Sequence, residues 1–127
     1  MDILLVDDNR DYLDIVTDAL KLGGYSVHPA SDGAQGAELL ESTDIDLIIS
    51  DIRMPRLDGI KLHAFARETD RYKTTKFVFL TGLKEYYSSS LTLNPSQDYL
   101  LDKTISLREL LRFIDALLFG EHREAWV

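Results

Sequence analysis

Acidic residues stand directly after two apolar runs of the chain. Asp7 and Asp8 follow residues 3–6, and Asp51 follows residues 45–50. A carboxylate at the end of a buried strand is a candidate for chemistry. Three carboxylates brought together suit Mg²⁺, a hard cation that takes oxygen ligands and would relieve their mutual repulsion. The sequence therefore favours a metal site at Asp7, Asp8 and Asp51.

Two more polar side chains follow apolar runs further along the chain. Thr81 comes directly after residues 76–80, and Lys103 comes shortly after residues 98–101. In an open parallel α/β sheet the carboxyl ends of the strands share one edge, where such folds bind their ligands. We therefore expect Thr81 and Lys103 at the same edge as the three aspartates.

Strand-like and helix-like patterns alternate along the chain, which is typical of βαβ units that build a parallel sheet covered on both faces. The predicted strands cover residues 3–6, 26–30, 45–50, 76–80 and 98–101. The predicted helices cover residues 10–22, 34–42, 59–69, 84–91 and 107–118. The fourth helix is the weakest, because it is short, rich in serine and followed by Asn94-Pro95.

Length and charge limit the classes of protein to consider. A chain of 127 residues fits one domain, expected over residues 1–120, with 121–127 as a tail or the start of a linker. The formal charge of -8 argues against direct nucleic-acid binding, because phosphate backbones attract basic surfaces. No apolar run approaches the roughly 20 residues of a membrane span. Because cysteine is absent, no disulfide can form, and the composition fits a cytoplasmic protein.

The stretch Asp51-Ile52-Arg53-Met54-Pro55-Arg56-Leu57-Asp58-Gly59 adds turn chemistry after the third strand. Together with Asp7-Asp8, Thr81 and Lys103 in this order, it resembles the receiver domain of two-component response regulators. The resemblance covers nearly all of the chain, from about residue 2 to residue 120. It implies an α/β, flavodoxin-like fold: a doubly wound five-stranded parallel sheet of order 2-1-3-4-5 with helices on both faces.

The resemblance implies Mg²⁺ as the cofactor. Asp8 and Asp51 would bind the metal directly, and the backbone carbonyl of Arg53 would supply a third oxygen. Asp7 would act mainly through water. Because only the carbonyl of Arg53 is used, its cationic side chain is no objection.

The resemblance also implies phosphoryl chemistry at the same place. Asp51 would attack a phosphorus atom in line and become an aspartyl phosphate. Thr81 would donate a hydrogen bond to a phosphoryl oxygen, and Lys103 would pair with the carboxylates at rest and with the phosphoryl group after transfer. Gly82 resembles the small residue that keeps the phosphoryl group accessible.

The implied function is that of a signalling phosphoacceptor in a phosphorelay, with only weak self-phosphorylation and autodephosphorylation activity. A sensor histidine kinase or a histidine phosphotransfer protein would donate the phosphoryl group, and an effector domain or partner protein would receive the signal. A homodimer could form through the face of the fourth helix, fifth strand and fifth helix. We expect no direct contact with nucleic acid or membrane.

The chain departs from the family pattern around Lys103. Thr104 follows this lysine where the family normally has proline, and Tyr99 lies one residue further from it than the usual aromatic. Because side chains alternate faces along a strand, we expect the Tyr99 ring on the opposite face unless a bulge intervenes, with Leu100 in the usual aromatic position. The signal would then pass through the threonine after the fourth strand and through the weak fourth helix.

Three other functions stay open. A phosphohydrolase of the haloacid-dehalogenase type also uses an aspartyl nucleophile with Mg²⁺, but it normally has a second aspartate two residues later, where this chain has Arg53. A receiver-like binding module that no longer accepts phosphate is kept open by Tyr99 and Thr104. A flavodoxin is less favoured, because Asp7-Asp8 would repel the phosphate that it seats after its first strand.

Other conspicuous side chains have a structural interpretation. His28, His63 and His122 show no spacing typical of metal ligands, so we interpret them as packing or surface residues. Tyr86 and Tyr87 are also interpreted as packing or surface aromatics, with partner binding as the alternative.

Overall fold

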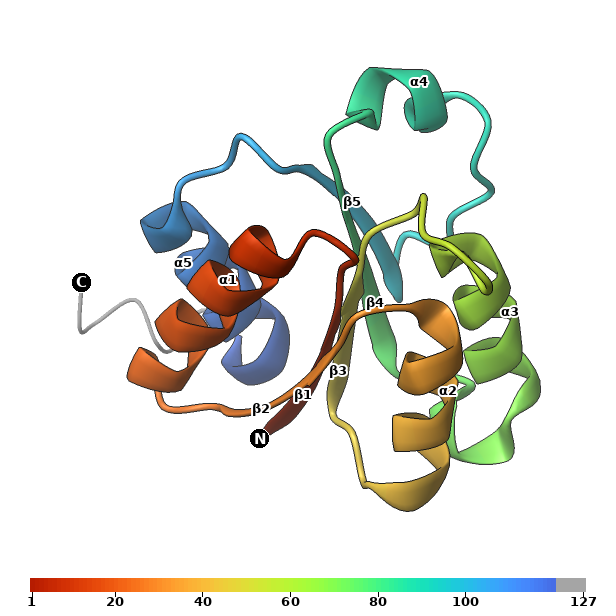
Figure 1. Cartoon of the computed structure of the whole chain (residues 1–127), viewed down its shortest axis with the longest axis horizontal. Helices are drawn as coiled ribbons and strands as arrows, with labels where there is room; N and C mark the ends of the chain where they lie inside the picture. The colour runs from red at the N-terminus through yellow and green to blue at the C-terminus, as the bar shows by residue number, and fades with distance from the viewer. Residues whose placement is uncertain (121–127) are drawn as a thin grey trace.

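The computed structural model describes residues 1–120 and contains one five-stranded parallel sheet. Its strands are β1 (Asp2–Val6), β2 (Ser26–Ala30), β3 (Leu47–Ser50), β4 (Lys76–Thr81) and β5 (Asp98–Asp102). Their order in the sheet is β2-β1-β3-β4-β5 (Figure 1). The predicted doubly wound α/β fold and its strand order are confirmed.

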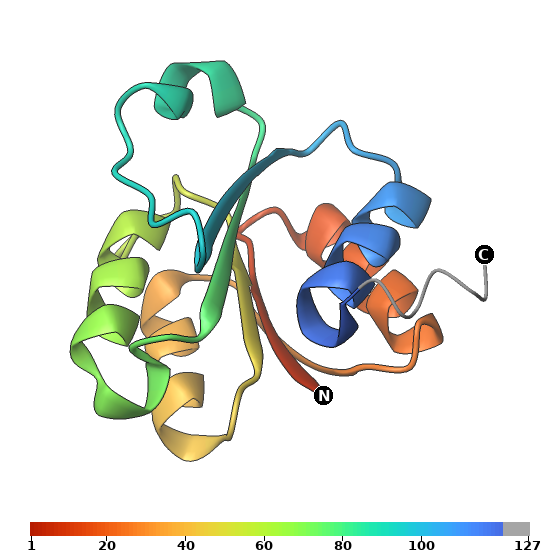
Figure 2. The same ribbon diagram turned by 180° about the vertical axis from the view of Figure 1, so that it is seen from behind.

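Helices cover both faces of this sheet. On one face lie α1 (Arg10–Leu22) and α5 (Leu107–Phe119), and on the other lie α2 (Gly33–Ser42) and α3 (Gly59–Glu68), as Figure 1 and Figure 2 show. The short α4 (Lys84–Ser88) stands beyond the end of the sheet, next to the loop that follows β3. Within residues 1–120, no helix has the length and apolar character needed to cross a membrane.

Side-chain caps set the starts of four helices. The capping residues, each accepting a main-chain N–H from the first helical turn, are Asn9, Asp32, Asp58 and Ser106. These caps follow β1, β2, β3 and β5 respectively, so each of them ends a loop at the carboxyl edge of the sheet. The local sequence therefore fixes the length of the loops that carry the candidate site residues.

The side chains of β1 alternate between two apolar layers. Leu4 and Val6 pack in the layer under α2 and α3, and Ile3 and Leu5 pack in the layer under α1 and α5. Burying one such side chain completely stabilises the fold by about 1.5–3 kcal/mol. This internal strand is thus fixed on both faces, as expected for a parallel sheet.

Continuous pairing between β4 and β5 decides the position of Tyr99. Val78 lies opposite Tyr99, and Phe79 lies opposite Leu100. The Tyr99 ring is on the α5 face, with its centroid 5.6 Å from that of Phe113. Leu100 packs in the other layer. Because no bulge interrupts the register, the expected placement of Tyr99 on the opposite face is confirmed.

Some predicted boundaries are wrong. β3 begins at Leu47 rather than at residue 45, because the pairing of Leu47 with Ile3 leaves residue 45 beyond the start of β1. α4 ends at Ser88 rather than at residue 91. At this end of the helix the Ser88 hydroxyl donates to the Glu85 carbonyl at 3.1 Å, a side-chain hydrogen bond that competes with the main-chain bonds of the helix. A short 3-10 helix before β4 was not predicted either. The predicted tail over residues 121–127 lies outside the described residues.

Candidate functional site

Main-chain hydrogen bonds extend the sheet pattern one residue past the ends of β1 and β3. The Asp7 N–H donates to the carbonyl of Ala30 at 3.1 Å, and the Asp51 N–H donates to the carbonyl of Val6 at 2.9 Å. Both aspartates are therefore positioned by the sheet itself. They lie at its carboxyl edge, where open α/β sheets bind their ligands.

Three carboxylates meet at this edge. Asp7, Asp8 and Asp51 each offer one oxygen, and these three oxygens lie within 4.8 Å of one another. Asp7 is only 3% exposed, whereas Asp8 is exposed. Main-chain N–H groups orient two of the carboxylates: that of Asn9 donates to Asp7 at 2.9 Å, and that of Ile52 donates to Asp51 at 2.7 Å. This set of oxygen donors fits Mg²⁺.

Lys103 bridges two of the carboxylates. Its ammonium lies 2.7 Å from Asp7 Oδ2 and 2.9 Å from Asp51 Oδ2. It also lies 4.8 Å from the ring centroid of Tyr12 on α1. The Lys103 N–H donates to the carbonyl of Thr81 at 3.0 Å, and residues 1–120 contain no cis peptide bond, so the main chain continues in the trans form after this lysine. The predicted site residues at the ends of β1, β3, β4 and β5 are thus brought together: Asp7, Asp51, Thr81 and Lys103.

Burial and ion pairing act in opposite directions on these groups. Burial raises the pKa of Asp7, and the hydrogen bond from Lys103 offsets only part of that rise. Burial alone would lower the pKa of Lys103, but its hydrogen bonds to Asp7 and Asp51 outweigh burial and raise that pKa. Lys103 is therefore cationic at neutral pH. Three carboxylates around one ammonium leave the edge acidic, which suits a divalent cation.

Thr81 is the last residue of β4 and is 2% exposed. Its hydroxyl oxygen accepts the N–H of Leu83 at 3.1 Å, and its hydrogen remains available to another acceptor. A Cβ added at Gly82 would meet no atom within 4 Å, so the main chain beside Thr81 borders open space. This arrangement fits the expectation that a small residue there leaves the site accessible.

Gly59 closes the loop that begins at Asp51. A Cβ at this position would lie 2.0 Å from the Asp51 carbonyl oxygen, so only glycine allows this approach. The Gly59 N–H donates to the carbonyl of Ile52 at 2.8 Å and completes the turn. The sequence predicted a tight turn here. The structure shows in addition that Gly59 approaches the main chain of Asp51 itself.

Arg53 makes a contact that the sequence did not predict. Its Nε–H donates to the hydroxyl of Tyr87 on α4 at 2.9 Å. At the position where a haloacid-dehalogenase enzyme would have an aspartate, this chain therefore has a cation turned toward α4. Tyr87 is buried and packs in the layer under α2 and α3, so its interpretation as a packing residue is confirmed. Tyr86 is exposed.

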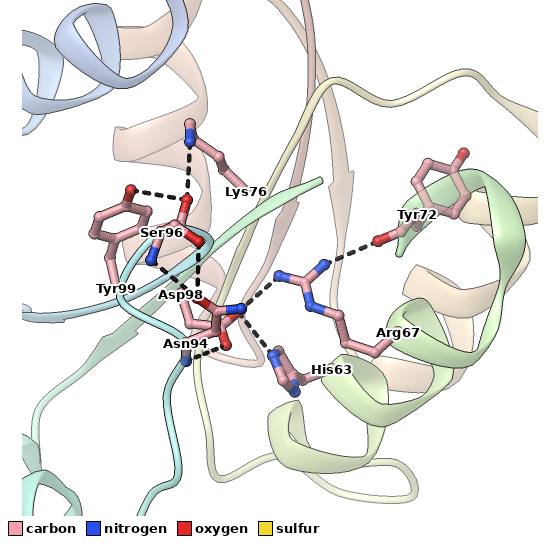
Figure 3. A network of polar contacts seen from close by, with 8 residues as sticks. All are labelled: His63, Arg67, Tyr72, Lys76, Asn94, Ser96, Asp98 and Tyr99. Atoms are coloured by element: carbon pink, nitrogen blue, oxygen red, sulfur yellow. Dashed lines mark hydrogen bonds and ion pairs between the residues drawn. The ribbon is translucent and has the colours of Figure 1, made fainter. Parts of the chain in front are cut away.

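A second polar network joins α3 to the start of β5 (Figure 3). His63 and Arg67, four residues apart on α3, contact the same Asp98 oxygen at 2.9 and 2.6 Å. Asp98 starts β5, is 5% exposed and also accepts the Asn94 N–H at 2.9 Å. His63 is therefore more than a packing residue, because it belongs to a buried ionic network. The helical spacing of His63 and Arg67 was the available signal.

Among residues 1–120, the other histidine, His28, adds no ligand to the site. His28 contacts Asp2 at 2.9 Å on the edge strand β2, which fits its interpretation as a surface residue. His122 lies outside the described residues.

Comparison with known proteins identifies relatives of this sequence. The family described as "Response regulator receiver domain" matches residues 3–115. The response regulator receiver protein CpdR of Brucella abortus (strain 2308) is 34% identical, and the match covers 93% of this chain and 97% of that protein. The transcriptional regulatory protein CpxR of Escherichia coli (strain K12) is also 34% identical. That match covers 94% of this chain but 50% of CpxR, so the chain spans about half of this relative.

Solved structures of similar fold agree with this family match. A receiver domain protein (CheY-like) from Methanospirillum hungatei JF-1 has a TM-score of 0.83 and 28% identity, with 97% of each chain covered. The response regulator protein TrrA from Thermotoga maritima, solved in complex with Mg(2+)-BeF, has a TM-score of 0.81 and 28% identity. That match covers 92% of this chain and 98% of the TrrA chain.

Proposed function

The chain belongs to the response regulator receiver domain family of two-component systems, and we propose that Asp51 is its phosphoacceptor. The observation that carries this proposal is the position of the Asp51 carboxylate, beside Asp7 and Asp8 and within 2.9 Å of the Lys103 ammonium. The family's members are signalling proteins. The proposed reaction is therefore the transfer of a phosphoryl group to Asp51 as a signal.

The proposed roles of the surrounding residues are those that the resemblance to the family implies, and the chemistry of these residues supports them. Asp8, Asp51 and the carbonyl of Arg53 would hold Mg²⁺, with Asp7 acting through water; the ion supplies charge neutralisation for the phosphoryl oxygens. Lys103 would leave the carboxylates to pair with the transferred phosphoryl group. Thr81 would donate its hydroxyl hydrogen to a phosphoryl oxygen.

The proposed donor is a sensor histidine kinase or a histidine phosphotransfer protein. A carboxylate oxygen of Asp51 forms the new bond to phosphorus while the bond between phosphorus and the donor nitrogen breaks. Output would pass through Thr81 and α4, because the Tyr99 ring is packed on the α5 face. An effector domain or a separate partner would read that change, and dimerisation through α4, β5 and α5 remains part of the proposal.

Acetyl phosphate tests this function without a kinase. With Mg²⁺, intact-protein mass spectrometry should show one added phosphoryl group on the wild type and on Asp14→Asn, an exposed control on α1. The Asp51→Asn variant should gain nothing. No gain in either protein would favour the phosphorylation-independent binding module, and equal gain in Asp51→Asn and wild type would place the phosphoryl group on another residue.

A further inference from the structure

One arginine joins the Asp51 loop to α4. Arg53 lies two residues after Asp51, and its Nε–H donates to the Tyr87 hydroxyl at 2.9 Å. Its guanidinium carbon also lies 5.3 Å from the ring centroid of Tyr86 and 6.0 Å from that of Tyr87. The two tyrosine rings meet edge to face at 4.9 Å. Arg53 therefore combines a hydrogen bond with cation–π contacts to the same helix.

The structure of α4 makes this contact important for its position. The helix has five residues, and Leu83, which precedes it, makes no side-chain capping bond. Tyr87 is the buried residue of α4, at 8% exposure. A helix this short has little stability of its own, so its position depends on tertiary contacts. An anchor on the Tyr87 hydroxyl is therefore able to hold the whole helix.

Thr81 acts on the opposite end of the same helix. Its hydroxyl oxygen accepts the Leu83 N–H at 3.1 Å, and the Leu83 carbonyl accepts the Tyr87 N–H at 3.2 Å. In the proposed function, rotation of the Thr81 hydroxyl toward a phosphoryl group would take this acceptor from Leu83 and leave the first turn of α4 free to shift. The Arg53 contact opposes that shift, because it holds Tyr87 against the Asp51 loop.

The loop that carries Arg53 is itself anchored. Leu57 packs so closely on Gly33 that a Cβ at Gly33 would lie 2.0 Å from the Leu57 carbonyl oxygen. Arg56 is ion-paired with the buried Asp32, which also caps α2. Because these contacts fix the loop to α2, the main chain that carries Arg53 has a defined position.

We propose that the contact between Arg53 and Tyr87 is a latch that holds α4 in its resting position. The Lys103 ammonium is paired with Asp7 and Asp51, the arrangement expected at rest, so we take this position of α4 as the resting one. The latch rests on the proposed function, because it opposes the displacement of α4 that a phosphoryl group on Asp51 would cause. Binding of a phosphoryl group and displacement of α4 are linked. Removing the contact between Arg53 and Tyr87 therefore raises the equilibrium constant for displacement of α4, and it strengthens phosphoryl binding by up to the same factor.

The variant Tyr87→Phe removes the hydroxyl and keeps the buried ring. Beryllofluoride, a phosphoryl mimic, is titrated into the full chain in saturating Mg²⁺ and followed by ¹H–¹⁵N NMR. Binding should be about two- to tenfold tighter in Tyr87→Phe than in wild type, the range expected for one hydrogen bond. Arg53→Met, which keeps the main-chain carbonyl, should act in the same direction. Tyr99→Phe, which loses a hydroxyl on the other face of β5, should bind as wild type does.

A second readout needs no ligand. In Tyr87→Phe without beryllofluoride, the amide signals of residues 84–88 should move toward their positions in the beryllofluoride-bound wild type. The hydrogen exchange of these amides should also accelerate. Unchanged affinity or weaker binding, together with unchanged exchange in α4, would overturn the latch. If beryllofluoride shifts no signal near Asp51 in the wild type, the proposed function fails. The exchange measurement still decides whether Arg53 restrains α4.

Discussion

At the scale of single residues, position after a strand predicted which side chains meet at one edge of the sheet. Asp7, Asp51, Thr81 and Lys103 each follow an apolar run, and the parallel sheet brings these run ends to one edge. The contact between Lys103 and the Tyr12 ring could not be predicted in the same way. It depends on how α1 crosses the sheet, which the sequence pattern alone does not specify.

Tyr12 should position Lys103. Replacing it with leucine removes the ring face that lies 4.8 Å from the ammonium, whereas Tyr12→Phe keeps that face. We predict that acetyl phosphate modifies Tyr12→Leu about two- to fivefold more slowly than wild type, and that Tyr12→Phe behaves as wild type. The measurement is the rate of mass gain under Mg²⁺. Equal slowing in both variants would assign the effect to the hydroxyl instead.

Gly59 should be required for the geometry of Asp51. In Gly59→Ala the new methyl group would lie 2.0 Å from the Asp51 carbonyl oxygen, so the loop must move. We predict a loss of about 1–3 kcal/mol in the free energy of unfolding, measured with urea. Gly82→Ala is the matched control, because its methyl group enters open space and should change stability by less than about 0.5 kcal/mol. Similar losses in both would contradict this explanation.

At the scale of helices and strands, periodicity and caps predicted which elements form but not all of their ends. Residue 45 was assigned to β3 because it is apolar, yet pairing with β1 decides where the strand begins. The His63, Arg67 and Asp98 network was missed for a related reason. Its members lie 31 and 35 residues apart along the chain, and only the packing of α3 beside β5 unites them.

The ionic network of His63, Arg67 and Asp98 should contribute strongly to the packing of α3 against β5. Removing the charge in Asp98→Asn leaves the Arg67 cation without its buried opposite charge, so we predict a loss of about 3 kcal/mol in unfolding free energy. The control is Asp44→Asn, in an exposed ion pair with Arg71, which should cost at most about 1 kcal/mol. Urea denaturation at neutral pH compares the two. Equal small losses would show that the network contributes little.

The same network predicts a pH dependence. Burial alone would raise the pKa of Asp98, but the Asn94 N–H, Arg67 and His63 outweigh burial and hold that pKa below its ordinary value of 3.8. Its stabilising contribution is therefore complete above pH 3.8 and is lost as the pH falls below that value. The difference in unfolding free energy between wild type and Asp98→Asn should shrink below pH 3.8. A constant difference would contradict the assignment.

At the scale of the whole molecule, the acidic edge links stability to metal. The chain carries a formal charge of -8, and three of its carboxylates meet at one point. Like charges held together destabilise the native state, and a cation that binds only the native state stabilises it by mass action. The sequence predicted this cluster because the fold itself was predictable from alternating strand and helix patterns.

Melting temperature should therefore rise with Mg²⁺. Without metal, we predict that Asp8→Ala melts above wild type, because one repelling charge is gone, and that it loses the response to Mg²⁺. Asp14→Ala, an exposed acidic control on α1, should keep the full response. Differential scanning calorimetry over a series of Mg²⁺ concentrations measures both. A full response in Asp8→Ala would place the metal elsewhere.

Locating the phosphoryl group on the chain tests the central claim most directly. Borohydride reduces an aspartyl phosphate to homoserine, which tandem mass spectrometry assigns to one position. After treatment with acetyl phosphate and Mg²⁺, we predict homoserine at position 51 and a marked loss of this product when Mg²⁺ is removed by a chelator. Homoserine at another aspartate, or a phosphorylated chain with no reducible aspartate, would contradict the assignment of Asp51 as the phosphoacceptor.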